Sequence, residues 1–592
     1  MFLATTSNQS YWKKDERILF LGEWCKLYSQ KQVWQNLQHD TLPYHWRNRE
    51  KLHRDYLYCE FLYEKLLVQL GGQLNQIHGV DYSSRYWRIV VGPWLFFFVS
   101  SLYDRYLSIR VAIDSGLVTN TWLPPSELGQ WTRADFLASL DMSNDDENYN
   151  LYIFSKIIQK LKGVHFEIKS DPLPHEKVDQ RKTFQPAVSL RDIAKTLLSF
   201  YSRLVPDHFN DIVFASSYLV SVDLARLQLS LGQMPYPCIP QVSYGRSPLN
   251  FNIRNNLRFP SVDNEFESLI DDMLMELIPT CYVEDYANIN QSCFKIFPRK
   301  PRVIFTASCL GDEGLKFWTA FNVEKGVKLV ATQHGGGYGS HRWSFYESHE
   351  IKISDRYFSW GWETKGVPKV VPVGSGILGH LKNYIKPDPN GFIIWVTYSL
   401  PRYARIQISD ILGPEFPSYL HDQEHFLRSV SAEVHDLLLL RLYMHDYGWD
   451  EYKRWEDIDT TLKIDEGKKP LVQLLRKSRL CIYTYNSTGY LEAFAANFPT
   501  ILFWGPKKRE VRTSAQPYFE GLRQAGILHD TPESAAEKVN EVYEDPLSWW
   551  NSPEVQVAKD KFCQQFAHTN DKWLPQWKEE LLKIADINEN GN

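Results

Sequence analysis

The chain has 592 residues, of which 43% are apolar, 23% charged and 14% aromatic. This composition excludes a disordered or fibrous protein, and at roughly 150 residues per domain the length predicts about two to four compact units. Lysine and arginine number 66 against 71 aspartates and glutamates, so the formal charge is −5. Because no long basic run is present to bind a phosphate backbone, we expect no nucleic-acid partner.

The eight cysteines are scattered along the chain, with no CxxC pair and no patterned Cys/His spacing. This distribution excludes a zinc knuckle and a disulfide scaffold and favours a reducing compartment. The N-terminus lacks the basic start and apolar core of a secretory signal. The longest uncharged apolar stretch, 89–103, is shorter than the ~20 residues that a membrane-spanning helix needs. We expect a cytoplasmic protein in which this stretch is a buried helix, and contact with the inner face of a membrane is the alternative.

Strand and helix signals begin near the N-terminus. Residues 17–22 form a short apolar run closed by glycine, which predicts a buried strand, and residues 49–70 predict a helix. From about 110 to 300, helical segments at 188–203 and 264–277 alternate with proline- and asparagine-rich connectors. We interpret this region as a mixed insertion in the first domain.

Short β-rich runs separated by helix-length or loop-length spacers follow from residue 302. They lie at 303–306, 327–332, 356–360 and 370–374. This spacing predicts a parallel sheet of the α/β class. We expect it to complete an N-terminal, acceptor-binding domain over residues 1–382.

The segment NYIKPDPNG at 383–391 has the composition of a hinge. A second series of elements follows it, with strands predicted at 392–397, 437–442, 480–483 and 500–504 and helices at 420–435 and 468–477. We therefore predict an α/β fold of two Rossmann-like, doubly wound domains that face each other across a cleft. The second domain would span 390–565, and a C-terminal helix and tail would occupy 566–592.

Ligands of open α/β sheets bind beyond the carboxyl ends of the strands, so residues just after the predicted strands are candidates. Asn486, Ser487 and Thr488 follow the strand at 480–483. Hydroxyls and backbone N–H groups at a helix N-terminus suit a phosphate, and Glu492, one turn later, suits a ribose hydroxyl. The alternative is that Ser487 or Thr488 only caps the helix.

A second candidate is the glycine-rich segment QHGGGYG, which starts at Gln333 directly after the strand at 327–332. Gly335 and Gly336 allow a backbone to approach a ligand closely, and His334 can donate or transfer a proton. The alternatives are a hydrogen-bonded histidine that closes a loop, or a flexible glycine lid.

Charged residues supply further candidates. Arg441 ends a strand of four leucines, and a buried arginine is costly unless it meets an anion such as a phosphate. An ion pair with Asp446 or Asp450 is the alternative. Asp312 and Glu313 follow a predicted strand, where a carboxylate can deprotonate an acceptor hydroxyl, although solvated surface carboxylates are commoner.

A local basic cluster comprises residues 507–509 and Arg512. It either faces a phosphate or an anionic acceptor, or forms a solvated loop.

Several long motifs resemble a known family. The resemblance rests on the stretches ILFLGEWCKLY, LPYHWRNREKLHRDYLY, IHGVDYSSRYWRIVVGPWL, QHGGGYG and YNSTGYLEAFAANFPTILFW. They resemble a bacterial family of O-antigen and surface-carbohydrate biosynthesis transferases, over about 1–110 and 300–510. More distantly, the two-domain layout is similar to GT-B glycosyltransferases, including CMP-Kdo and CMP-sialic acid transferases and the polyol-phosphate transferases of teichoic acid synthesis.

In several of those GT-B enzymes, an R-x-H-P element and a serine/threonine-rich turn hold the nucleotide phosphates. Here the turn at 486–488 stands in the matching place and Arg441 keeps the arginine, but a tyrosine and a methionine replace the histidine and proline. This departure leaves His334 or His445 to supply an imidazole.

The resemblance implies a glycosyltransferase that moves a sugar from a nucleotide-activated donor, with CMP-linked donors among the candidates, to a surface polysaccharide or O-antigen. The acceptor would be a glycan or a lipid-linked glycan. No DxD element is present, so we predict neither a metal nor a cofactor. Alternatives on the same fold are a polyol-phosphate transferase, a nucleotide-sugar epimerase and a non-catalytic glycan-binding assembly protein.

The combined hypothesis places the turn at 486–488 opposite the glycine segment across the cleft. It assigns donor binding to Gln333, Gly335, Gly336, Arg441, Asn486, Ser487, Thr488 and Glu492, and catalysis to Asp312, Glu313 and His334.

Overall fold

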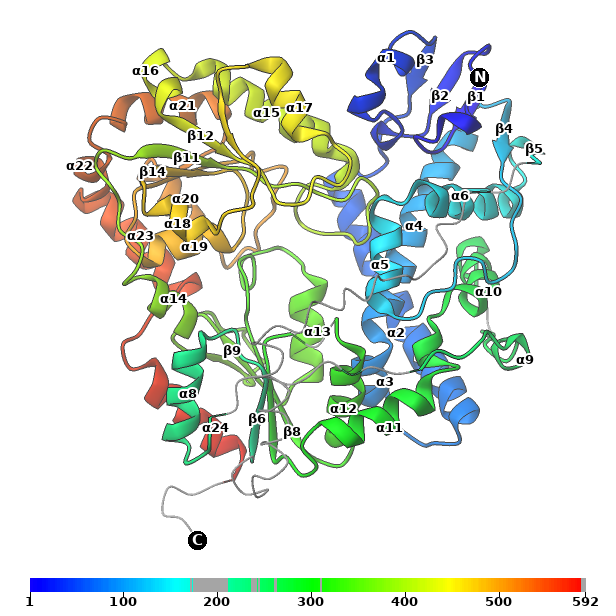
Figure 1. Cartoon of the computed structure of the whole chain (residues 1–592), viewed down its shortest axis with the longest axis horizontal. Coiled ribbons are helices and arrows are strands. Elements are labelled where there is room, and N and C mark those ends of the chain that lie inside the picture. The colour runs from blue at the N-terminus through cyan, green and yellow to red at the C-terminus, as the bar shows by residue number, and fades with distance from the viewer. Residues whose placement is uncertain are drawn as a thin grey trace, which may run out of the picture.

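The computed structural model describes residues 1–170, 173, 211–235, 242, 245–259, 263–308 and 311–586. The helix predicted at 188–203 and the last residues of the predicted tail lie outside these ranges. Three β-sheets organise the described part of the chain, and helices pack around each of them (Figure 1).

The first sheet lies near the N-terminus and has the strand order β3-β2-β1-β4-β5. Its strands are β1 (Phe2–Ala4), β2 (Ile18–Phe20), β3 (His39–Thr41), β4 (Asn120–Leu123) and β5 (His165–Ile168). All of its pairings are parallel. The strand predicted at 17–22 is confirmed as β2.

Long helices pack in the same core as the first sheet. The predicted helix at 49–70 is confirmed as α2 (Arg49–His78), which begins at the Asn48 cap and ends where Gly79 takes a left-handed φ of 64°. The apolar stretch at 89–103 contributes to α4 (Gly92–Asp114), in which Trp94, Phe96, Phe97 and Phe98 are buried. Within the described ranges, no helix combines the length and the apolar content needed to cross a bilayer.

The second sheet has the order β10-β9-β8-β7-β6 and is also parallel. Its strands are β6 (Ile212–Ser216), β7 (Val303–Thr306), β8 (Lys328–Thr332), β9 (Arg356–Ser359) and β10 (Val370–Pro372). On one face Ile304 joins the core that contains α12 (Glu313–Glu324). On the other face Phe305 packs with α8 (Ser221–Ser230) and α24 (Trp573–Ile584), so helices cover both faces.

The strands divide residues 1–382 differently from the sequence prediction, which placed one sheet there with an insertion at 110–300. β4 and β5 complete the first sheet, and β6 is the edge of the second. β5 is largely exposed and β4 has only alternate buried side chains, so no apolar run marks either of them. β6 has a short apolar run that lies inside the region interpreted as an insertion. Helix 264–277 is confirmed as α10 (Glu265–Leu277).

The third sheet has the order β13-β12-β11-β14-β15-β16, again with parallel pairings. Its strands are β11 (Phe392–Val396), β12 (Leu438–Arg441), β13 (Lys463–Asp465), β14 (Ser478–Tyr483), β15 (Thr500–Phe503) and β16 (Leu528–His529). The four strands predicted here are confirmed. The predicted helix at 420–435 is divided into α15 (Phe416–Ser429) and α16 (Ala432–Leu437), because Ser431 caps the second helix.

Parallel sheets covered by helices confirm the predicted α/β class. In the third sheet the strand order reverses between β11 and β14, which is the point where open α/β sheets bind ligands. In Figure 1 this sheet lies at the upper left in yellow and orange, and the second sheet lies below it in green.

The C-terminal helix α24 returns to the second sheet and is held there by Trp577. The indole Nε1 donates to the Gly374 carbonyl at 3.0 Å, and the ring lies 5.3 Å from that of Phe305 and 5.4 Å from that of Phe358. Helix α24 therefore covers a sheet that lies more than 200 residues earlier in the chain.

Replacing Trp577 with alanine should destabilise the second sheet by about 3–5 kcal/mol, because a buried indole is removed and a cavity remains. Denaturant unfolding followed by circular dichroism measures the change. The matched control is Glu579→Ala on the exposed side of α24, which should stay within about 0.5 kcal/mol of the parent. Equal effects of the two variants would contradict the anchoring role.

Candidate functional site

Two loops from different sheets meet in the middle of the molecule. The glycine segment follows β8, and the turn that carries Ser487 and Thr488 follows β14. The Gly336 N–H donates to Thr488 Oγ1 at 2.9 Å. Since each loop leaves the carboxyl end of a parallel strand, the carboxyl edges of the second and third sheets meet here, where ligands of such sheets bind.

The glycines let two backbones touch. A Cβ on Gly336 would lie 2.2 Å from the carbonyl carbon of Ser487 and 2.6 Å from the Thr488 nitrogen, and a Cβ on Gly335 would lie 3.3 Å from Thr488 Oγ1. Any side chain at position 336 would therefore separate the two loops. The sequence analysis expected these glycines to approach a ligand, whereas the partner that they approach is the turn of the third sheet.

The turn begins α19 (Thr488–Ala495), whose N-cap is Ser487. The Ser487 side chain makes no capping hydrogen bond, and Thr488 Oγ1 accepts from the glycine segment. Simple capping, the alternative for these hydroxyls, therefore does not describe either of them. Backbone N–H groups at the start of α19 point to the meeting point of the loops.

Gln333 and Asn486 hold the two loops in shape. Gln333 Oε1 accepts from the Trp360 backbone at 3.0 Å and from Trp362 Nε1 at 2.7 Å. Asn486 Oδ1 accepts from the Tyr490 hydroxyl at 2.8 Å, and its Nδ2 donates to a serine of the glycine segment at 3.4 Å. Both side chains are buried, and their polar atoms form hydrogen bonds within the protein. The sequence analysis expected them to bind the donor, whereas here they hold the two loops in position.

His334 lies beside a buried carboxylate. Its Nδ1 is 3.6 Å from Glu350 Oε1, on α13 (Phe345–Ile353). Glu350 also accepts from the hydroxyls of Tyr338 at 3.1 Å and Tyr357 at 3.3 Å. Burial lowers the pKa of His334 and raises the pKa of Glu350. A neutral imidazole that stays about one quarter exposed and is oriented by a buried acid can serve as a general base.

Glu492 lies one turn into α19. Burial raises the pKa of its carboxyl to about 7, and no charge or hydrogen bond offsets this effect. Within the described part of the chain, no cation pairs with this carboxylate. A half-buried acid without a protein partner is a typical feature of a ligand site.

Tyr218 was not identified from the sequence. It follows β6, its ring lies 6.2 Å from those of both His334 and Trp360, and the negative charge of Glu492 adds to burial in raising its pKa. Its φ of 54° lies in the left-handed region, which is costly for a bulky residue. The ring is 40% exposed, so this strained tyrosine presents an aromatic face beside the imidazole. No sequence signal marked it, because β6 itself was not predicted.

Arg441 has a protein partner. Its Nη1 lies 2.5 Å from Asp465 Oδ2, and its Nη2 donates to the Gly467 carbonyl at 3.3 Å. The parallel register places Arg441 directly opposite Asp465 on β13. The structure therefore favours the alternative of an ion pair over a phosphate ligand, although neither Asp446 nor Asp450 is the partner.

The structure corrects the predicted role of Asp312 and Glu313. Asp312 caps α12 by accepting from the Leu315 nitrogen at 2.7 Å. Glu313 is 5% exposed and binds Lys316 Nζ at 2.9 Å and the Tyr282 hydroxyl at 3.0 Å. An enclosed carboxylate held by a lysine is unavailable to a substrate hydroxyl, which argues against Glu313 as the base, whereas Asp312 has a structural role as the cap of α12.

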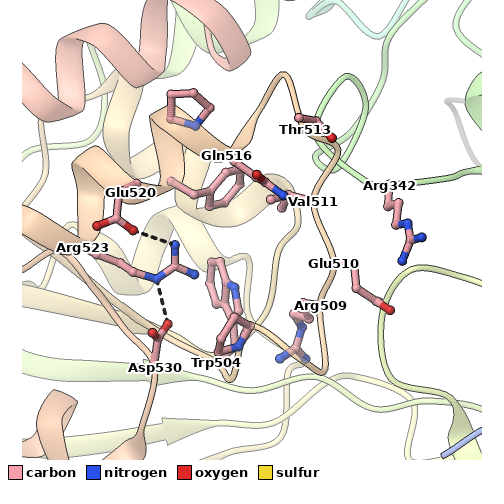
Figure 2. A pocket seen from close by; sticks show the side chains of 13 residues that line it. Arg342, Trp504, Arg509, Glu510, Val511, Thr513, Gln516, Glu520, Arg523 and Asp530 are labelled. Atoms are coloured by element: carbon pink, nitrogen blue, oxygen red, sulfur yellow. Dashed lines mark hydrogen bonds and ion pairs between the residues drawn. The ribbon is translucent and has the colours of Figure 1, made fainter. Parts of the chain in front are cut away.

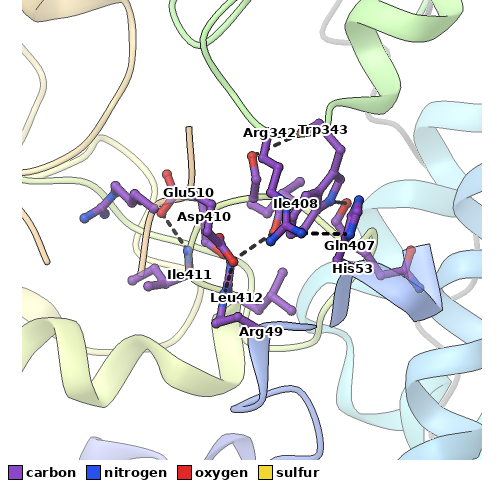
Figure 3. A network of polar contacts seen from close by, with 12 residues as sticks. Arg49, His53, Arg342, Trp343, Gln407, Ile408, Asp410, Ile411, Leu412 and Glu510 are labelled. Atoms are coloured by element: carbon purple, nitrogen blue, oxygen red, sulfur yellow. Dashed lines mark hydrogen bonds and ion pairs between the residues drawn. The ribbon is translucent and has the colours of Figure 1, made fainter. Parts of the chain in front are cut away.

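A polar network joins α2 to the end of the loop after β8 and to the segments around Asp410 and Glu510 (Figure 3). Arg49 contacts Glu510 at 2.6 Å and the Asp410 carbonyl at 2.9 Å. Arg342, which continues the glycine segment, donates to Glu50 at 2.8 Å and lies 3.2 Å from His53 Nδ1. These contacts connect segments that belong to all three sheets.

The predicted basic cluster at 507–512 lies in this network. Arg509 binds Asp410 at 2.9 Å and the Tyr398 hydroxyl at 2.7 Å, and Arg512 binds Glu347 at 2.7 Å. The arginines of the cluster therefore connect loops of the protein. Among the described residues, no group of three or more His, Cys, Asp or Glu side chains is arranged to hold a metal ion.

The sequence profile described as LIC12162 family transferase matches residues 1–581. The chain belongs to this family. Membership confirms the predicted transferase class of enzyme. A search of curated proteins gives no match.

Several solved structures are similar to this transferase at low identity. Anabaena Alr3699/HepE in complex with UDP-glucose shares 13% identity, over 54% of this chain and 90% of its own, with a TM-score of 0.31. The wall teichoic acid polymerase TagF shares 12% over 67% and 98%, with a TM-score of 0.31. Acinetobacter baumannii MurG shares 10% over 63% and 99%, with a TM-score of 0.31.

Substituting Gly336 with alanine should lower stability by about 1–3 kcal/mol, because the new methyl group overlaps the backbone of the 486–488 turn. Denaturant unfolding measures the loss. The control is Gly72→Ala in α2, where an added Cβ meets nothing within 4 Å and alanine should stabilise the helix by up to about 1 kcal/mol. A neutral Gly336 variant would show that the two loops do not touch.

The raised pKa of Glu492 makes a prediction about pH. The folded protein holds this proton more tightly than the unfolded chain does, so ionisation costs stability as pH rises from 4.5 through about 7. Glu492→Gln should therefore be more stable than the parent by on the order of 2–3 kcal/mol at about pH 8, and the difference should vanish near pH 4. Urea unfolding across this range measures it, with the exposed Glu537→Gln as a control that shows no such trend.

Proposed function

We propose that this transferase is a glycosyltransferase, which moves a sugar from a nucleotide-activated donor to a hydroxyl group of a glycan acceptor. The observation that carries the proposal is the pairing of His334 with buried Glu350 where the carboxyl edges of two parallel sheets meet. This place combines a candidate base for the acceptor hydroxyl, a helix N-terminus that suits a departing phosphate, and an acid without a protein partner that suits a sugar hydroxyl.

In the proposed reaction, His334 Nε2 takes the proton of the acceptor hydroxyl. The freed oxygen forms a bond to the anomeric carbon of the donor, and the bond from that carbon to the phosphate oxygen breaks. The nucleotide leaves with the electron pair, and this single displacement inverts the configuration of the sugar carbon. Glu350, whose Oε1 lies 3.6 Å from Nδ1, is a positioning residue that helps to orient the imidazole.

The start of α19 is suited to the leaving group. Backbone N–H groups and the positive end of the helix dipole stabilise the charge that develops on the departing phosphate. Glu492, one turn later, can accept hydrogen bonds from the ribose hydroxyls of the donor, and Tyr218 offers an aromatic face to the transferred sugar. The start of α19 and Glu492 follow the third sheet, and Tyr218 and His334 follow the second, so the site is complete only when both sheets contribute.

We further propose that the acceptor belongs to the surface polysaccharides, including O-antigen and lipid-linked glycans. The support is the resemblance of the QHGGGYG and YNSTGYLEAFAANFPTILFW motifs to that group of transferases. A CMP-linked donor is the first to test, for the same reason.

A nucleotide panel and one substitution test the function. Among CMP, CDP, UDP, GDP and dTDP, one base should stabilise the protein by about 2.7 kcal/mol at about 100 times its dissociation constant, measured by thermal shift. With the matching nucleotide sugar, His334→Gln should lower kcat by about 10²–10⁴-fold while nucleotide stabilisation persists. Glu350→Gln should lower kcat less and shift its pH profile.

The matched control is His425→Gln, a half-exposed histidine of α15 that pairs with Glu533 at 3.0 Å. It should keep full activity. Full activity of His334→Gln would eliminate the proposed base. A protein that no nucleotide stabilises would contradict donor binding, and turnover of donor without any acceptor would indicate an epimerase.

A further inference from the structure

A cavity of about 830 Å³ opens beside the glycine segment, at the carboxyl ends of β15 and β16 (Figure 2). Trp504 and Asp530 come from the ends of these strands, and the intervening segment at 506–523 supplies most of the wall. Arg342, from the loop of the second sheet, closes the opposite side. The volume lies in the range of roughly 300–1,000 Å³ that ligand sites occupy.

This cavity is separate from the site of the proposed reaction. None of His334, Glu492 and Ser487 lines it. The cavity and the site of the proposed reaction share one loop, however, because the loop after β8 carries both His334 and Arg342. His341 of that segment pairs with Val511 of the cavity wall as an isolated β-bridge, so the loop lies between them.

The charges of the wall balance. The lining contains the three arginines Arg342, Arg509 and Arg523 and the three acids Glu510, Glu520 and Asp530. They are paired: Arg523, for example, lies 2.8 Å from Asp530 and 3.6 Å from Glu520. A nucleotide or another anion would meet three carboxylates and no surplus of positive charge. The balance of charge therefore favours an uncharged ligand.

The uncharged side chains of the wall are either apolar or polar. Val511 supplies apolar surface, the largely buried rings of Trp504 and Phe519 add a small apolar area, and Thr513 and Gln516 are exposed polar side chains. Guanidinium, carboxylate and amide groups offer paired donors and acceptors at the spacing of neighbouring hydroxyls. This combination suits a polyol with apolar faces, which is the chemistry of a neutral sugar.

We infer that the cavity binds uncharged sugar units of the acceptor glycan, away from the hydroxyl that reacts. This inference rests on the proposed function, because only glycosyl transfer identifies the bound sugar as part of the acceptor. It assigns acceptor recognition partly to the C-terminal sheet, through the 506–523 segment, and makes Arg342 a link between the acceptor and the loop of His334.

Filling the cavity tests this assignment. Thr513→Trp places an indole in the wall from an exposed position, and Ser514→Trp places the same side chain on the exposed neighbour that does not line the cavity. The probes are maltotriose, cellotriose and chitotriose, with trigalacturonate as an anionic trisaccharide of equal length. Saturation-transfer NMR at millimolar probe concentration detects binding.

We expect signals from at least one neutral trisaccharide with the parent and with Ser514→Trp, loss of those signals with Thr513→Trp, and none from trigalacturonate. Sugar transfer to acceptor should fall about tenfold or more in Thr513→Trp, while stabilisation by the nucleotide is unchanged. The assignment is overturned if no neutral probe binds, if binding survives in Thr513→Trp, or if trigalacturonate binds best.

The result is distinguishable from failure of the proposed function. The nucleotide panel and His334→Gln test the reaction and do not involve the cavity. Neutral-sugar binding that Thr513→Trp abolishes supports the cavity assignment even in a protein that no nucleotide stabilises.

Discussion

The contact between the backbones at Gly336 and Ser487 sets the geometry on which the site depends. A Cβ at this glycine would overlap the turn, so the absence of a side chain fixes how closely the carboxyl edges of the second and third sheets approach. His334 and Tyr218 follow strands of the second sheet, and Glu492 follows a strand of the third. The close approach of the two edges places Tyr218 near both His334 and Glu492. A bulkier residue would separate His334 from α19, the helix that carries Glu492.

Ion pairs surround this contact. Arg49 with Glu510, Arg509 with Asp410 and Arg512 with Glu347 each join segments far apart in the chain and are largely shielded from water. Such pairs are costly to form but costlier to break singly, since one buried charge would remain alone. They therefore give the junction a defined arrangement more than extra stability.

Glu492 and His334 differ from these pairs. Burial raises the pKa of the Glu492 carboxyl, and no cation of the described residues offsets this effect. Burial lowers the pKa of His334 and so keeps its imidazole neutral. Burying this acid without a cation costs stability, and such a cost is a common consequence of function. The neighbouring cavity, whose charges are all balanced, has the opposite character and suits a neutral ligand.

The sequence alone determined four of the six strands of the third sheet, because these strands form largely buried apolar runs such as Ile393–Val396, whereas the edge strands β13 and β16 have no such run. It also identified the two loops that meet, since glycines and small hydroxyl residues after a strand are local signals. The tertiary structure decided the rest. The partner of Arg441 depends on the register with β13, and the enclosure of Glu313 depends on helices packed from elsewhere. Glu350 became the partner of His334 only when α13 folded back, because a contact between distant residues leaves no mark in the local pattern of either.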